Sequence, residues 1–497
     1  MAGLKKGFED YSADGGNHLE VKVEVAVIGA GAGGCAVACA LAERGIETAV
    51  FEEGRHWKSK DFKPSNPWAF KNLYQDRGAR VAIGSGWIPV NGGRGVGGST
   101  LINSAISFKT PPSIVADWRK LGFDPDGDFM DLVDRVWTDI GVMQNPESVQ
   151  GANNLLFKKG TEAMGMQGAY LHRSAPSCTG CGICQLGCPS GGKNSADRTF
   201  LYQALQLGGV TVYADCRAEG VETSGGRVTA VTGKLIHPDS QEAVGTFRVV
   251  ADRFVLSAGP IGSPRFLMKN GLDPNEHVGQ HLRLHPAIGV YALFEEEVVH
   301  WHGVSQGYYV DRWDEGWLLQ TATITPDNQF LGIPLPVGPE LNEVMSQMRH
   351  LGAAGAIIHD EDSVGSVGRA TISFELGDHD RQLLIKGMRE TARVWFAAGA
   401  HTTISSVVGG GLIRDPGDID KVIALDTPYN RLLAVASHPM GTNRMGADPD
   451  KAVVDPSGRV GGWENLFVAD ASVFPSSLGV NPQVTVMAIG LMVGRGV

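Results

Sequence analysis

Long hydrophobic runs are missing from this sequence of 497 residues. No stretch reaches the roughly 18 uninterrupted apolar residues that a membrane-spanning helix needs. Residues 1–20 also lack the apolar segment that is typical of secretory signals. We therefore expect neither a membrane span nor a signal peptide.

The sequence also has no excess of basic residues over acidic ones. Lys and Arg total 43 against 54 Asp and Glu, which gives a formal net charge of −11. Such a chain has no general attraction for a phosphate backbone, so we expect no nucleic acid partner. The hydrophobic fraction of 42% is that of a globular protein, and the length leaves room for two or three domains.

Cysteine is scarce and unevenly distributed. Four of the seven cysteines lie between Cys178 and Cys188, which does not suit a framework of long-range disulfides, so we expect a cytoplasmic protein. These four, followed by a proline, have the C-x2-C-x2-C-x3-C-P spacing of bacterial ferredoxin loops: Cys178, Cys181, Cys184 and Cys188. The spacing indicates an iron–sulfur cluster, 4Fe-4S or 3Fe-4S. Structural zinc, a disulfide or an empty loop would also fit it.

A strand–turn–helix pattern stands near the start of the chain. Gly29, Gly31 and Gly34 form G-x-G-x-x-G between a β-branched run and a helical pattern. The first glycine allows the turn, the second lets a pyrophosphate approach, and the third permits close packing of helix on sheet. Glu52 ends the next strand, where a carboxylate can accept hydrogen bonds from ribose hydroxyls. The unit predicts a dinucleotide site, although spacing alone does not separate NAD from FAD.

Period-two patterns between residues 210 and 262 predict strands that return to the first sheet, so that the nucleotide-binding domain is discontinuous. Further strand patterns occur at 287–294, 317–325 and 369–376, and residues 378–400 predict one long helix.

Ordered motifs give the sequence a resemblance to a known family. GAGAGG with FEEG, GRGVGGSTLIN, VLSAGPIGSP, VGQHLRLHP, HPMGTNRMG and VADASVFPSSLGVNPQVTVMAIG occur in the order seen in glucose-methanol-choline (GMC) oxidoreductases. With its ferredoxin-like Cys loop, the sequence is similar to long-chain alcohol and sterol oxidases and to iron–sulfur flavin dehydrogenases.

The resemblance implies an α/β fold in which a discontinuous, Rossmann-like FAD-binding domain is joined to a second, α+β substrate domain. That second domain is expected to be built on a six-stranded antiparallel sheet. We expect five parts: residues 20–110, FAD-binding; 111–200, a helical insertion with the Cys-rich loop; 201–286, FAD-binding; 287–430, substrate-binding; and 431–497, FAD-binding and catalytic.

Matching motifs imply the remaining FAD contacts. Ser99 and Asn103 are expected at the diphosphate and flavin, the backbone of Ala218 at the adenine, and Asp470 with Gln483 at the ribityl chain and ring. Some relatives carry a flavin-linking His in the loop that here reads Leu101 and Ile102, so we expect non-covalent FAD.

Oxidation of an alcohol to a carbonyl requires a base beside the hydroxyl and an electron sink beyond the carbon. The resemblance selects His438 as the base and Asn481 as its partner, which would hydrogen-bond the substrate oxygen. The implied function is therefore FAD-dependent alcohol oxidation by hydride transfer to flavin N5. The segment SSLGVNPQ favours a bulky, apolar alcohol as the small-molecule substrate.

The sequence does not identify the electron acceptor. With an iron–sulfur cluster, electrons would leave singly toward an external acceptor and the enzyme would be a dehydrogenase. Without one, O2 would be the oxidant of an alcohol oxidase. The same motifs would also suit a flavin and iron–sulfur relay with no alcohol chemistry, or a flavin-dependent isomerase.

Overall fold

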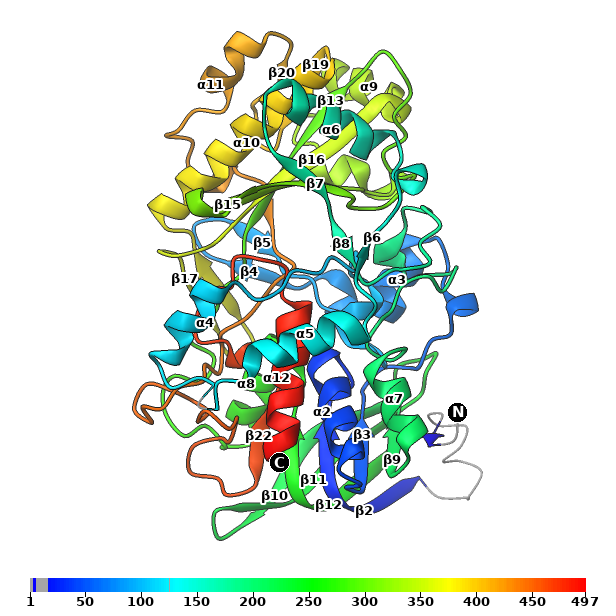
Figure 1. Ribbon diagram of the computed structural model, residues 1–497, viewed down its shortest axis with the longest axis vertical. Coiled ribbons are helices and arrows are strands. Elements are labelled where there is room, and N and C mark those ends of the chain that lie inside the picture. Colours follow the sequence, from blue (N-terminus) through cyan, green and yellow to red (C-terminus); the bar gives the residue numbers. More distant parts are fainter. Residues whose placement is uncertain (1–2, 6–16, 125) are drawn as a thin grey trace.

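The computed structural model describes residues 3–5, 17–124 and 126–497. These residues form two lobes, one above the other in Figure 1, each built around a sheet of eight strands. The mixed α/β architecture predicted from the sequence is confirmed.

The first sheet carries the predicted strand–turn–helix unit. Its order is β1-β9-β3-β2-β12-β11-β10, with β22 also paired to β12. Pairs from β1 to β12 are parallel, and the last two pairs are antiparallel. The strands span Leu4–Lys5 (β1), Val210–Tyr213 (β9), Thr48–Phe51 (β3), His18–Ile28 (β2), Ala243–Leu256 (β12), Arg227–Ile236 (β11), Cys216–Ser224 (β10) and Leu466–Val468 (β22).

Helices α2, α7 and α12 lie side by side over this sheet (Figure 1), at Ala32–Glu43, Phe200–Leu207 and Gln483–Gly496. Glycine permits the close approach of α12 to α2, because a Cβ on Gly490 would come within 2.6 Å of the Gly33 carbonyl oxygen. Residues from both ends of the sequence are thereby held together at one sheet.

The second sheet is antiparallel, with the order β20-β19-β13-β16-β15-β14-β7 and β21 beside β13. The expectation of six strands was wrong, because short edge strands extend the sheet to eight. The strands span Leu412–Ile413 (β20), Thr402–Ser405 (β19), Ala287–Leu293 (β13), Leu351–Ile358 (β16), Trp317–Thr321 (β15), Tyr308–Arg312 (β14), Gly168–Tyr170 (β7) and Ala434–Val435 (β21). The predicted long helix is α10 (Asp378–Ala398), and it packs on this sheet.

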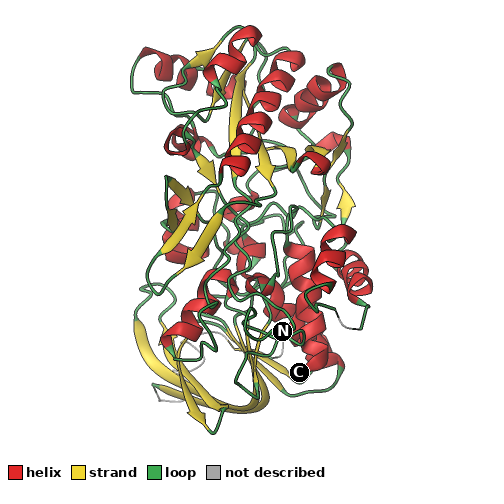
Figure 2. Cartoon of the chain, turned by 90° about the vertical axis from the view of Figure 1, so that its left-hand side faces the viewer, coloured by secondary structure: helices red, strands yellow, loops and turns green. Residues whose placement is uncertain are grey.

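A smaller sheet, with the order β17-β18-β4-β5, lies between the lobes (Figure 2). Its strands are Val364–Val367, Ile372–Glu375, Val81–Ile83 and Trp87–Pro89; β6 (Met143–Gln144) pairs with β8 (His172–Arg173). The other helices are α3 (Asn66–Leu73), α4 (Pro112–Arg119), α5 (Phe129–Asp139), α6 (Ala152–Ala163), α8 (Gly259–Lys269), α9 (Pro339–Ser346) and α11 (Ile419–Val422).

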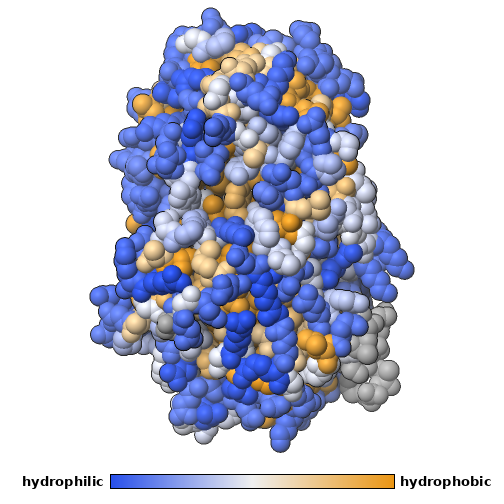
Figure 3. Space-filling view, viewed as in Figure 1, coloured by the Kyte–Doolittle hydropathy of each residue, from blue (hydrophilic) through white to orange (hydrophobic). Residues whose placement is uncertain are grey.

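Hydrophilic side chains cover most of the face seen in Figure 3, and hydrophobic ones show between the lobes. In the part of the chain that the structure describes, no helix combines the length and apolar character needed to cross a membrane. The division of the sequence into five parts stays a prediction.

Candidate functional site

The glycine motif forms the turn between β2 and α2. Gly29 has φ of +106°, a left-handed conformation that favours glycine. A Cβ on Gly34 would lie 2.0 Å from the Gly29 carbonyl oxygen, so no larger residue fits there. A Cβ on Gly31 would meet no atom within 4 Å, because Gly31 faces an open cavity. The N-terminus of α2 thus offers free backbone dipoles to an anionic group in that cavity.

Glu52 ties three loops together at the end of β3. Its Oε2 accepts a hydrogen bond from the Ala30 amide, and its Oε1 accepts from the amides of Gly54 and Gly95, each at 3.0 Å. Burial raises the pKa of Glu52 to about 7, although the three amides act in the opposite direction. The carboxylate therefore shapes the cavity wall as well as facing a ligand.

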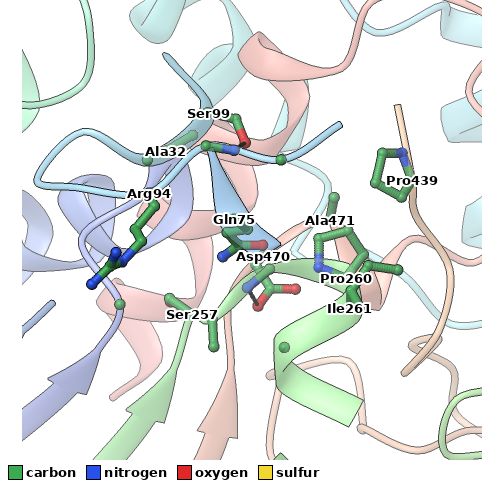
Figure 4. Close-up of a pocket in the computed structure, with 18 of the residues that line it drawn as sticks. Ala32, Gln75, Arg94, Ser99, Ser257, Pro260, Ile261, Pro439, Asp470 and Ala471 are labelled. Carbon is green, nitrogen blue, oxygen red and sulfur yellow. Dashed lines mark hydrogen bonds between the residues drawn. The ribbon is translucent and has the colours of Figure 1, made fainter. Parts of the chain in front are cut away.

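The cavity has a volume of about 850 Å³ and is lined almost wholly by residues outside 287–430. It is lined by both predicted catalytic residues and by every predicted cofactor residue except Gly34, namely Gly29, Gly31, Glu52, Ser99, Asn103, Ala218, Asp470 and Gln483. In Figure 4, Arg94 and Pro439 stand at opposite ends of the labelled residues, with Gln75 and Asp470 between them. Such an elongated, partly polar cavity suits a long dinucleotide.

Two of these residues also fix the cavity walls. Asp470 accepts hydrogen bonds from the Gly259 amide at 2.9 Å and from the Ser472 amide at 2.8 Å. Gln483 accepts from the Asn103 side chain at 2.8 Å and donates to the Ile106 carbonyl at 2.8 Å. Segments far apart in the sequence are thereby held in one arrangement around the cavity.

His438 and Asn481 meet at the cavity surface. The Asn481 amide nitrogen lies 3.2 Å from His438 Nε2, and Asn481 Oδ1 accepts a hydrogen bond from Gln320 Nε2 at 3.1 Å. This network makes the Asn481 nitrogen the donor and leaves His438 Nε2 as an acceptor. Gln320, on β15 of the second sheet, was missed at the sequence level because no motif surrounds it.

Burial lowers the pKa of His438 to about 4, so its imidazole is neutral at neutral pH. The ring of His285 lies beside it with its centroid at 5.7 Å. His285 Nε2 accepts hydrogen bonds from the amides of Leu478 and Gly479, which hold this ring in place. A neutral imidazole can take a proton from a hydroxyl group once that group replaces the Asn481 amide at Nε2.

The cysteine loop lies beside the cavity, and its Gln185 lines the cavity wall. None of the seven cysteines, all of which lie in the described part of the chain, forms a disulfide. Among the described residues, no group of three or more His, Cys, Asp or Glu side chains is placed to hold a metal ion. The predicted cluster and the zinc alternative therefore find no support in how the sulfur atoms are placed.

A buried arginine contacts the loop instead. Arg173 is 1% exposed, and its guanidinium donates to Cys178 Sγ at 3.4 Å and to Cys184 Sγ at 3.3 Å. Its other hydrogen-bond partners are the Ser104 carbonyl and the Asn145 side-chain oxygen, both uncharged. Sequence reasoning missed Arg173, although it stands only five residues before the first cysteine of the loop.

Family models described as GMC oxidoreductase match residues 70–287 and 360–490, and a model of an NAD(P)-binding Rossmann-like domain matches residues 27–84. An uncharacterised GMC-type oxidoreductase of Mycobacterium tuberculosis is 33% identical over 482 residues, which cover 95% of this chain and 75% of that protein. The chain belongs to the GMC oxidoreductase family. It is accordingly an FAD-dependent oxidoreductase, and the predicted family and fold class are confirmed.

Other similar proteins differ in the substrates that their names give. A long-chain-alcohol oxidase of Arabidopsis thaliana is 26% identical over 97% of this chain and 68% of its own length. Among solved structures, pyridoxine 4-oxidase from Mesorbium loti has a TM-score of 0.70 at 18% identity and covers 95% of this chain and 99% of its own. An Aspergillus oryzae formate oxidase variant has a TM-score of 0.67 at 14% identity, covering 96% and 98%. These two structures support the fold.

Proposed function

We propose that the protein oxidises an alcohol to a carbonyl compound by hydride transfer to FAD, with His438 as the base. The observation that carries this proposal is the pairing of His438 with Asn481 on the wall of the FAD cavity. When bound, FAD supplies the electron sink that accepts the hydride.

The residues around the cavity have separate roles in the proposed reaction. His438 Nε2 accepts the hydroxyl proton, while Asn481 donates a hydrogen bond and orients the oxygen. Gln320 holds the Asn481 side chain from the opposite side. Leu101 and Ile102 carry no group that could form a bond to FAD, which supports non-covalent binding.

A bulky, apolar alcohol is the substrate class we propose. The similarity to long-chain-alcohol oxidases, and to a cholesterol oxidase of Acinetobacter baumannii at 23% identity, supports this class. Gln306 is the one residue from 287–430 among the described residues that line the cavity, so the substrate specificity rests on a small part of the second lobe.

Anaerobic mixing of the FAD-loaded protein with long-chain alcohols is expected to bleach the flavin absorbance. Because protonation of Nε2 removes the accepting lone pair, the bleaching rate should stay constant from neutral pH downward and fall only near pH 4, the pKa to which burial lowers His438. Stopped-flow absorbance at saturating FAD measures this profile. Absence of bleaching with every alcohol tested contradicts the function, and a midpoint at the ordinary histidine pKa of about 6.5 contradicts a desolvated base.

As a second candidate feature, we propose that Cys178, Cys181, Cys184 and Cys188 would hold an iron–sulfur cluster, which would supply single-electron transfer toward an external acceptor. The ferredoxin spacing supports it, and so does Arg173, a buried cation whose hydrogen-bond partners in the described structure include two sulfurs and no carboxylate. A buried positive charge that has no carboxylate partner is stabilised by anionic sulfur nearby.

Metal analysis of anaerobically purified protein tests this feature. We expect about four acid-labile sulfides and about three or four iron atoms per chain, and their loss when Cys184 is replaced by Ser. Protein that binds FAD but contains neither iron nor sulfide contradicts the cluster and favours the oxidase that uses O2.

A further inference from the structure

A second cavity lies on the other side of the turn that borders the FAD cavity. Its volume is about 360 Å³. It is lined by the segment after β3 and by residues around the start of α7. The lining residues are His56, Trp57, Lys58, Ser59, Phe62, Leu101, Cys188, Lys193, Ser195, Asp197, Arg198 and Tyr202. This volume is close to the lower limit of about 300 Å³ for small-molecule sites, so it suits one compact ligand.

A single turn separates the two cavities. Leu101 lines the second cavity, whereas its neighbours Thr100 and Ile102 line the FAD cavity. Lys193 holds this turn from the side of the second cavity, because its Nζ donates to the carbonyl oxygens of Leu101 at 2.8 Å and Asn103 at 2.7 Å. A ligand in the second cavity would therefore be within electron-transfer reach of a flavin in the first.

Aromatic rings form the apolar part of the second cavity. Trp57, Phe62 and Tyr202 line it, and the Trp57 ring is braced edge-on by Trp68 at 5.2 Å between centroids. A planar aromatic ligand would stack against these rings.

Three basic side chains line the second cavity. Lys58 and Arg198 are exposed at the mouth, and Lys193 is buried at the floor. Burial raises the pKa of Asp197 to about 6 and lowers the pKa of Lys193, so the positive charge of the cavity is carried mainly by the exposed Lys58 and Arg198. In a chain whose net charge is −11, this local excess of cations favours an anionic ligand.

We propose that the second cavity binds a small, anionic quinone that accepts the electrons of the reduced flavin across the turn. This inference rests on the proposed function. The reaction balances, since the alcohol loses two electrons and two protons while one quinone gains two of each and both of its C=O groups become C–OH. Electrons cross the turn, and protons enter from solvent past His56, whose Nε2 lies 4.0 Å from the Asp197 carboxylate.

Calorimetric titration of the oxidised holoenzyme with naphthalene sulfonate, which has the ring and charge but no redox chemistry, tests the site. The double variant Lys58→Ala/Arg198→Ala should weaken binding about tenfold, and Trp57→Leu, which removes an aromatic ring that the ligand stacks against, should weaken it as well. Lys60→Ala is the matched control, because Lys60 carries the same charge on the same segment but does not line the cavity. Undetectable binding, or equal binding by the double variant and the native protein, overturns the proposal.

Anaerobic turnover with an alcohol and naphthoquinone sulfonate tests the electron transfer. The double variant should raise the KM for the quinone about tenfold, while its flavin is still bleached by alcohol at the native rate. In this assay Trp57→Leu should also raise the KM for the quinone, because the quinone ring loses an aromatic surface to stack against.

Competition between naphthalene sulfonate and the alcohol would place the ligand in the FAD cavity and overturn the proposal, as would binding without quinone reduction. Failure of alcohol to bleach the flavin concerns the proposed function instead, and binding that remains sensitive to the double variant would then still support the anion site.

Discussion

Replacing His438 by Ala is expected to lower the rate of alcohol-dependent flavin reduction by about 100- to 10,000-fold while FAD stays bound, because general-base catalysis typically contributes that much. His438→Gln should be nearly as slow. Its side-chain oxygen can still accept a hydrogen bond from Asn481, but it cannot take up a proton. Stopped-flow reduction at saturating alcohol measures both variants.

His379→Ala is the matched control, because it makes the same chemical change at an exposed position outside the cavity. We expect it to reduce flavin at the native rate. Near-native reduction by His438→Gln together with slow reduction by His438→Ala would indicate that the side chain only positions the substrate, and would contradict its role as the base.

Gly31→Val is expected to weaken FAD binding by about one to two orders of magnitude while leaving the FAD-free protein as stable as before. Gly31 has an ordinary φ of −80°, and a Cβ there meets no atom within 4 Å. The added side chain therefore clashes only when the diphosphate occupies the cavity, and overpacking of this kind costs about 1–3 kcal/mol. Flavin fluorescence gives the affinity, and thermal melting of FAD-free protein gives the stability.

Gly34→Ala provides the contrast within the same motif. Its Cβ would lie 2.0 Å from a backbone oxygen whether or not FAD is present, so this variant should lose folding stability first. Equal FAD affinity for Gly31→Val and the native protein would show that the diphosphate does not pass this glycine.

The nucleotide half of the site could be predicted because its geometry follows from local sequence. The left-handed turn at Gly29 and the close contact at Gly34 leave little choice but glycine, and both stand between a strand and a helix in the sequence itself. His438 and Asn481 were found only through motif resemblance, since 43 residues separate them and no periodicity joins them.

Other parts of the site depend on tertiary packing and could not be predicted. Gln320 reaches Asn481 because the second sheet folds over the first lobe, and a glutamine in a strand carries no signal of that contact. The cysteine spacing led to an expected metal site, yet spacing alone does not show where the sulfur atoms lie relative to Arg173. Short edge strands such as β20 and β21 are likewise set by pairing and carry little pattern of their own.

Isotopic substitution at the carbon that bears the hydroxyl tests the central claim most directly. If the cavity beside His438 carries out hydride transfer, alcohol deuterated at that carbon should bleach the flavin clearly more slowly than unlabelled alcohol in anaerobic stopped-flow mixing, because the C–H bond breaks in the step observed. Equal bleaching rates for the two alcohols, with chemistry shown to limit the reaction, would contradict the account.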